Sequence, residues 1–311
     1  MRIIHTIDDT LLIPLCESGD KLYHYTSANA LQGILSGEFW ATESNFLNDT
    51  MEFQVATDIC CEVLDAHMSN KQLCRVLQER IREEVVRTQT PGLSTDETIA
   101  YTGNYIISFC LDEDSPLMWS SYSDYIGYCI QFDFERLINS FSDKRIANSF
   151  LHGQVIYNHE FQLRLLEETI KHSYFDVPQF EYLNSWGDFD SLNDDQIEKI
   201  KQFIAVEVSA YNMFFKLPCF EGENEYRFVF KVGHDGGRYR KEDLWQQYFR
   251  VKDEVLIPYI KLKYEPKGAI EKILVGAKNK SDIAVKGLQY YCRNLKLDHI
   301  ETKTSEVPLR Y

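Results

Sequence analysis

The sequence is short of positive charge. Its 311 residues hold 33 Lys and Arg against 48 Asp and Glu, which gives a formal net charge of −15 at pH 7. A field of that sign repels phosphate backbones and anionic lipids, so it disfavours binding to bulk nucleic acid or to a membrane surface. This composition is still compatible with a small local basic groove.

Long apolar runs are also missing. No uninterrupted stretch approaches the roughly 20 residues that a transmembrane helix needs. The N-terminal stretch, MRIIHTIDDTLLIPLCESGDK, carries acids where a secretory signal needs a positive start and a long apolar segment. The expected location is therefore the cytoplasm, where cysteines stay reduced.

The eight cysteines do not form a metal-binding pattern. None makes a Cys-x-x-Cys pair, whereas a zinc site needs clustered ligands at short spacing. Most lie among Leu, Ile, Val or Phe, so we expect buried, inert thiols and no metal. The glycine-rich dinucleotide and phosphate loops, the G-x-S-x-G elbow and the H-E-x-x-H motif are absent as well.

Periodicity predicts an α+β fold. Alternation over 21–26 (KLYHYT) predicts a strand, and Ser27 suits the N-cap of a helix over about 28–36. Further strands are expected over 38–43, 104–111, 127–134, 221–231, 256–263, 270–276 and 296–302. Further helices are expected over 51–89, where Asn70 divides the pattern into two helices, and over 159–174, 193–215 and 281–294. No repeat or linker divides the chain. The whole chain is therefore predicted to form one domain, with helical insertions at about 51–100 and 159–215.

The tripeptide Glu223-Asn224-Glu225 is the most suggestive local feature. On a strand, residues two apart share a face, so both carboxylates would project into one space. Such a pair suits a reaction with a cationic transition state, in which one acid stabilises charge and the other orients a nucleophile. Arg227 shares that face and can pair with Glu225. From spacing alone, a solvated strand face with an ordinary ion pair is the preferred interpretation.

Three other places in the sequence can contact a ligand. His24 lies mid-strand beside Thr26, where it can donate to a ribose hydroxyl, although taken alone a half-buried histidine bonded to a neighbouring carbonyl is the preferred interpretation. Trp119 and Tyr122 lie three apart on a predicted helical turn and can form an aromatic wall, but such spacing is more typical of a core. Asn48 lies in a polar turn that more simply caps a helix.

Five segments, taken in chain order, are similar to a bacterial family, the domain of unknown function 2971. They cover nearly the whole chain and each is short. They are LYHYTSANALQGIL (22–35), FWATESNFLNDTMEF (39–53), ISFCLDEDSPLMWSSYSDYIGYCIQFD (107–133), EGENEYRFVF (221–230), and IEKILVGAKNK (270–280) with TSEVPLR (304–310).

The pattern of that family resembles the ADP-ribosyltransferase superfamily. This second resemblance implies a split, mostly antiparallel β-sheet core with NAD, as substrate, bound between two small sheets. It gives catalytic roles to His24, which would hold a ribose hydroxyl, to Glu225, which would stabilise positive charge, and to Glu223, which would position the acceptor. The cofactor contacts that it implies are His24, Tyr25, Thr26, Asn48, Ser108, Trp119, Tyr122 and Arg227.

The implied activity is cleavage of NAD and transfer of ADP-ribose to a macromolecule, as in a mono-ADP-ribosyltransferase. The acidic surface favours a protein acceptor over nucleic acid, and analogy suggests a toxin or phage-defence effector. With water as acceptor, the enzyme would be an NAD hydrolase. A hypothesis from another class is a non-enzymatic module on the same fold that senses a metabolite or binds a protein.

Overall fold

The structure, a computed structural model, divides into two compact units. It describes residues 3–5, 12–47, 52–89, 103–141, 150–232, 246–279 and 281–308. The helical unit comprises Met1–Leu15, Leu47–Gly103 and Gln154–Glu221, and the sheet unit comprises Cys16–Phe46, Asn104–Gly153 and Gly222–Tyr311. Each unit is described by itself below.

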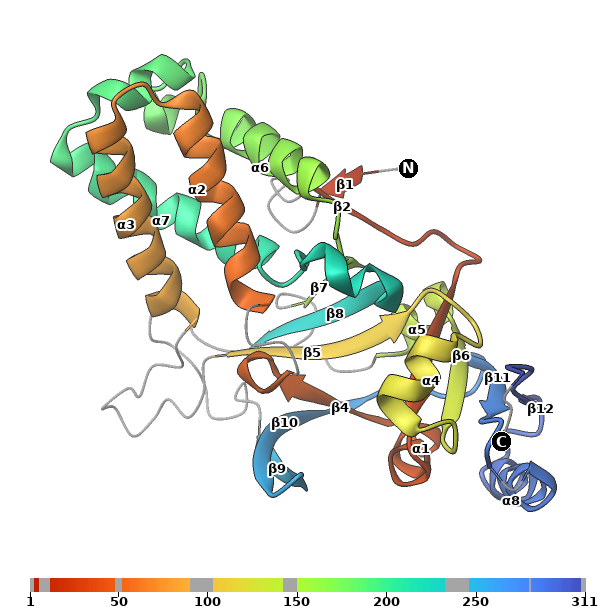
Figure 1. The fold of residues 1–311 in the computed structure, drawn as a ribbon. Helices are drawn as coiled ribbons and strands as arrows, with labels where there is room; N and C mark the ends of the chain where they lie inside the picture. The colour runs from red at the N-terminus through yellow and green to blue at the C-terminus, as the bar shows by residue number, and fades with distance from the viewer. Residues whose placement is uncertain are drawn as a thin grey trace. The chain divides into compact units, whose positions relative to one another are not determined.

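The helical unit is built from the two predicted helical insertions (Figure 1). In it α2 packs against α6, and α3 packs against α7. Its elements are β1 (Ile3–His5), β2 (Leu12–Pro14), η2 (Glu52–Gln54), α2 (Val55–His67), α3 (Lys71–Gln89), α6 (His159–Tyr174), η4 (Pro178–Phe180), η5 (Trp186–Ser191) and α7 (Asp194–Tyr211). The two insertions therefore share one apolar core, although some 70 residues separate them in sequence.

Local capping fixes where the long helices of this unit begin. The Asn158 side chain accepts a hydrogen bond from the Phe161 backbone N–H at the start of α6. Asn193 and Gln196 form a reciprocal capping box at the start of α7. Each cap satisfies backbone N–H groups that the first turn of a helix leaves without intrahelical partners.

The sheet unit contains a mixed sheet of ten strands in the described part of the chain. The strands are β3 (Lys21–Thr26), β4 (Glu38–Glu43), β5 (Gly103–Cys110), β6 (Tyr128–Asp133), β7 (Phe150–Gln154), β8 (Glu225–Val232), β9 (Gln247–Lys252), β10 (Val255–Lys263), β11 (Ile270–Val275) and β12 (Glu301–Thr304). The order is β12-β11-β6-β3-β5-β4-β10-β9, and β8 pairs with β5 and β7. Only β11 and β12 run parallel among the neighbours on this path. The predicted α+β class with a mostly antiparallel sheet is confirmed.

Short helices complete the sheet unit. They are α1 (Ala28–Leu35), η1 (Ser44–Phe46), α4 (Pro116–Ser123), α5 (Phe134–Ser140), η6 (Pro218–Glu223, at the boundary with the helical unit) and α8 (Ser281–Asn294). Ser27 caps α1 as predicted, since its hydroxyl accepts from the Ala30 backbone N–H. None of the helices within the described ranges has the length and apolarity needed to cross a bilayer.

Strand β5 is where the sheet changes partners. Its C-terminal end faces β3 through the pair Tyr23 and Cys110. Its earlier residues, Tyr105 and Ile106, face β4 instead. Between these two stretches, around Ser108, neither strand pairs with β5, and we call this stretch the seam.

Side-chain alternation gives the sheet two faces. On one, which we call the aromatic face, Phe39, Phe109 and Phe132 pack with ring centroids 5.6 to 6.0 Å apart. Phe228 of β8 joins them, 4.9 Å from Phe109. On the other, the α4 face, Tyr25 packs in a cluster with Cys110, Met118, Trp119, Cys129 and Leu274.

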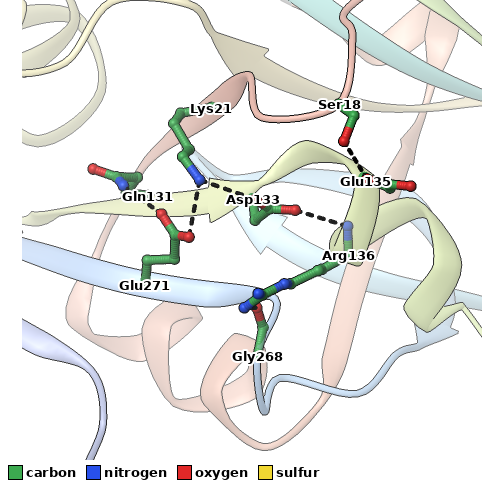
Figure 2. Close-up of polar contacts among 8 residues, drawn as sticks. All are labelled: Ser18, Lys21, Gln131, Asp133, Glu135, Arg136, Gly268 and Glu271. Atoms are coloured by element: carbon green, nitrogen blue, oxygen red, sulfur yellow. Dashed lines mark hydrogen bonds and ion pairs between the residues drawn. The ribbon is translucent and has the colours of Figure 1, made fainter.

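A polar network ties three strands of this sheet together (Figure 2). The Lys21 ammonium donates to Asp133 of β6 and to Glu271 of β11, at 2.9 Å each. Gln131 of β6 donates to the second carboxylate oxygen of Glu271 at 2.8 Å. The network therefore links β3, β6 and β11 through side chains as well as through their backbones.

Most of the cysteines are buried as predicted. Six of the eight are buried, Cys16 is half-buried and Cys219 is exposed. Burial raises the pKa of the Cys110 thiol to about 12, which keeps it protonated and unreactive at neutral pH. The exposed Cys219 is the exception to the predicted pattern.

Candidate functional site

His24 lies at the seam. Its Nδ1 is 2.9 Å from the backbone carbonyl oxygen of Ser108, one of the residues of β5 that neither β3 nor β4 pairs with. Its ring meets Phe39 and Phe109 edge-on, with centroids 5.8 and 5.7 Å away. The imidazole thus lies where hydrogen bonds between the strand backbones would otherwise continue.

The Ser108 carbonyl decides the tautomer of His24. A carbonyl oxygen only accepts hydrogen bonds, so Nδ1 carries the proton and donates it. Burial lowers the pKa of His24, and the positive charge of Arg250 lowers it further, against the raising effect of the Ser108 bond. In the neutral ring, Nε2 therefore keeps a lone pair that can accept a hydrogen bond. His24 would accept from a ligand hydroxyl through Nε2, whereas the sequence analysis expected it to donate.

The neighbours of His24 on β3 divide between the two faces. Thr26 is buried and shares the face of His24 by alternation. Tyr25 lies on the α4 face, where its hydroxyl donates to the Asp112 carbonyl at 3.0 Å and accepts from the Ser115 N–H at 2.7 Å. Tyr25 therefore supports the turn before α4, and the structure does not place it beside His24.

The predicted aromatic wall does not form as a pair. Trp119 is 0% exposed and meets the ring of Tyr25 edge-on at 5.1 Å, and its indole N–H donates to Asp114 at 2.7 Å. Tyr122, three residues further along α4, is exposed. The spacing on α4 is as expected, but Trp119 belongs to the core of the sheet unit.

Glu223 and Glu225 do not lie on one strand, so the predicted alternation is wrong at this point. Glu223 ends the 3-10 helix η6, and β8 begins only at Glu225. Asn224 between them has φ +40°, in the left-handed region, and this turn of the backbone breaks the period of two. The two carboxylates therefore do not project together as strand neighbours.

The predicted pairing of Glu225 with Arg227 is present. Nε of Arg227 donates to Oε1 of Glu225 and a terminal guanidinium nitrogen donates to Oε2, both at 2.8 Å. The two residues are 5% and 1% exposed. Because both carboxylate oxygens already bind the guanidinium in this bidentate geometry, the pair forms a tight cross-link within β8.

Glu225 and His24 lie on opposite faces of the sheet. Phe228 contacts Phe109, and Phe109 contacts His24, so these three share the aromatic face. Glu225 and Arg227 are an odd number of residues from Phe228 on β8 and therefore face the other way. The structure does not bring the predicted catalytic acid and the predicted catalytic histidine onto one surface.

The comparisons with known proteins concern part of the chain. Residues 118–228 match the family model described as Protein of unknown function (DUF2971). The predicted resemblance to this family is confirmed. The DUF2971 match starts within α4 and ends in β8, so it covers the Glu225–Arg227 pair and leaves out His24. No curated protein and no solved structure matches the chain.

The remaining predicted contacts have simple outcomes. Ser108 contributes its backbone carbonyl, as described above. Asn48 lies outside the described residues. Among the residues that the structure describes, no group of three or more His, Cys, Asp or Glu side chains is arranged to hold a metal ion.

Two residues were missed by the sequence analysis, Arg250 and Thr42. Arg250 of β9 donates to the Thr42 hydroxyl of β4 at 2.8 Å, and its charge adds a small lowering of the His24 pKa to the larger effect of burial. In sequence, Arg250 is one polar position in YFRVK and carries no motif. Only the pairing of β9 with β10 and of β10 with β4 brings it to Thr42. Thr42 is three residues from Phe39 on β4 and therefore faces the other way, so Arg250 lies on the α4 face and His24 on the aromatic face.

Proposed function

We propose that this chain binds NAD or a closely related dinucleotide at the seam of its sheet, with Nε2 of His24 accepting from a ribose hydroxyl. The observation that carries this proposal is the 2.9 Å bond between His24 Nδ1 and the Ser108 carbonyl. It fixes the ring in one orientation and one tautomer before any ligand arrives. A preoriented acceptor loses little conformational entropy on binding.

Binding is proposed ahead of cleavage because of where the acids lie. Glu225 faces away from His24 and holds both oxygens on Arg227. To stabilise positive charge on a ribose, it would first have to exchange that guanidinium for the ligand. The geometry thus favours the metabolite-sensing hypothesis over the enzymatic one.

ADP-ribosyl transfer is the second function that we propose, on an ADP-ribosyltransferase-like fold. The changeover of β5 between β3 and β4 supports it, since that fold has a split sheet. Glu225 would supply the carboxylate for cleavage, with a protein as the favoured acceptor or water in an NAD hydrolase. A role as a toxin or phage-defence effector depends on this activity.

Thermal unfolding with NAD and with ADP-ribose tests the binding proposal. A ligand at 100 times its Kd raises the melting temperature by an amount on the order of 5 °C for a chain of this size. His24→Asn keeps an N–H for the Ser108 carbonyl but has no counterpart of Nε2, so it should lose this rise. His299→Asn is the matched control, because His299 is exposed and accepts only from the Gly268 N–H.

Three outcomes decide between the functions. Absence of a rise in the unchanged protein, or a full rise in His24→Asn, would overturn the binding proposal. Release of nicotinamide from NAD, followed by chromatography, would establish cleavage. Loss of that release in a Glu225→Gln variant that is still folded at the assay temperature would assign the acid.

A further inference from the structure

Arg250 carries a charge that the described protein does not neutralise. Its terminal nitrogen donates to the neutral Thr42 hydroxyl, while its Nε is buried and has no hydrogen-bond partner. Among the residues that the structure describes, no Asp or Glu pairs with it. Burial lowers the pKa of this guanidinium, with a smaller opposing effect from Tyr259.

The Arg250 guanidinium does not become neutral by losing its proton when it is buried. Its ordinary pKa lies so far above neutrality that it stays charged inside proteins. A partly buried cation without an anion is unfavourable, because the lost hydration is not replaced. Its planar fork of N–H groups matches the oxygens of a phosphate or a carboxylate. The missing partner is therefore an oxyanion.

We propose that Arg250, supported by the Thr42 hydroxyl, binds the phosphate oxygens of a nucleotide on the α4 face of the sheet. Alternation places His24 on the aromatic face, so this site is separate from the dinucleotide site proposed at the seam and goes beyond it.

The surroundings of Arg250 favour a phosphate on a nucleotide over a free carboxylate. The sheet register places Tyr248 and Tyr259 opposite one another, and Tyr259 opposite Thr42, so all three share a face with Arg250. Trp40, next on that face, stacks on Tyr259 with centroids 4.4 Å apart and is 38% exposed. A flat aromatic surface beside a cation suits a base and a phosphate together.

Binding of inorganic pyrophosphate, measured by isothermal titration calorimetry, tests the phosphate site without a ribose. The unchanged protein should bind it. Arg250→Met should weaken binding at least tenfold, and Arg250→Lys should weaken it less, because lysine keeps the charge but lacks the fork. Thr42→Val gives a second variant that leaves the guanidinium in place and should also weaken binding. Arg293→Gln, on exposed α8, should bind as the unchanged protein does.

The following results would contradict the inference. Failure of the unchanged protein to bind pyrophosphate, or equal binding by Arg250→Met, would overturn the inference. Binding of malonate in preference to pyrophosphate would overturn the choice of phosphate in favour of a carboxylate. A melting curve for each variant shows whether it is folded before its binding is measured.

Failure of this inference differs from failure of the proposed function. If NAD raises the melting temperature in a His24-dependent way but pyrophosphate does not bind, the dinucleotide site stands and this inference fails. If pyrophosphate binding depends on Arg250 while ADP-ribose and NAD do not bind, the phosphate site stands and the dinucleotide function fails.

Discussion

Two arginines of the sheet unit, Arg227 and Arg250, differ in how their positive charges are balanced. Arg227 on β8 is almost wholly buried and holds Glu225 in a bidentate pair. Arg250 on β9 is partly buried and donates to a hydroxyl. The first charge is balanced within its own strand, whereas the second has no acidic partner among the residues that the structure describes. A balanced charge indicates architecture, whereas an unbalanced one indicates a ligand.

Glu207 in the helical unit shows a third way to bury a charged group. It accepts from the Tyr174 hydroxyl at 2.8 Å, and burial raises its pKa to about 7. A carboxyl group can thus take up a proton and become neutral when no cation pairs with it. Arg250 has no such route. The lack of an acid paired with it among the described residues is therefore informative, whereas the lack of a cation beside Glu207 is not.

The largest effect is expected from breaking the balanced pair. Glu225→Gln leaves Arg227 buried with a neutral partner, and removing one member of a buried ion pair costs about 3 to 5 kcal/mol of unfolding free energy. Urea unfolding followed by circular dichroism measures this loss. Glu271→Gln is the matched control. It removes a half-exposed acid from Lys21 and should cost less than about 1 kcal/mol. Equal losses in the two variants would show that the Glu225–Arg227 pair stabilises the fold no more than a half-exposed ion pair does.

The next effect is a pH dependence set by Glu207. Its pKa in the folded protein is about 7, against an ordinary 4.5, so the folded chain keeps a proton that the unfolded chain loses. This residue therefore makes the unfolding free energy fall as pH rises from 4.5 to 7, by about 2 to 3 kcal/mol, and the effect levels off above pH 7. Glu207→Gln stays neutral and should lose this slope.

Urea unfolding at pH 5, 6, 7 and 8 measures that slope for both proteins. Subtracting one profile from the other removes the contribution of groups that they share, including the buried histidines. Glu198→Gln, an exposed position on the same helix, should keep the slope of the unchanged protein. A constant difference between Glu207→Gln and the unchanged protein across this pH range would contradict the assignment.

The smallest effect has the opposite sign. Arg250→Met removes an unbalanced cation and keeps most of the side-chain volume, so without ligand the unfolding free energy should rise by about 1 kcal/mol. Arg227→Met should lower it, because it removes the guanidinium from which both oxygens of the buried Glu225 carboxylate accept hydrogen bonds. Thermal and urea unfolding of the two variants in phosphate-free buffer measure the contrast. A loss of stability in both would mean that Arg250, too, has a structural role.

Much of the fold could be predicted from local pattern. Alternation over KLYHYT and the cap at Ser27 gave β3 and α1 with bounds within a residue of those observed. Helical periodicity located all four long helices of the helical unit. The strands β1, β2, β7 and β9 were not predicted. The first three have only three to five residues, which carry too little periodic signal.

The candidate site was harder to predict because it depends on pairing between distant strands. The alternation of EYRFVF correctly grouped Glu225 with Arg227, but nothing in the sequence announced the left-handed turn at Asn224 that separates Glu223. The tautomer of His24 depends on a carbonyl 84 residues away. Arg250 became notable only because no Asp or Glu within the described ranges pairs with it, which is a property of the folded surroundings.

The bond between His24 and Ser108 has one more consequence. The His24 imidazole bonds the Ser108 carbonyl at the seam, and it also carries Nε2, the nitrogen that we assign to ligand recognition. Architecture and specificity are therefore tied to the same ring. A descendant of this protein that changed its ligand by replacing the histidine would also have to supply a new donor for that carbonyl, so the two properties are constrained to evolve together.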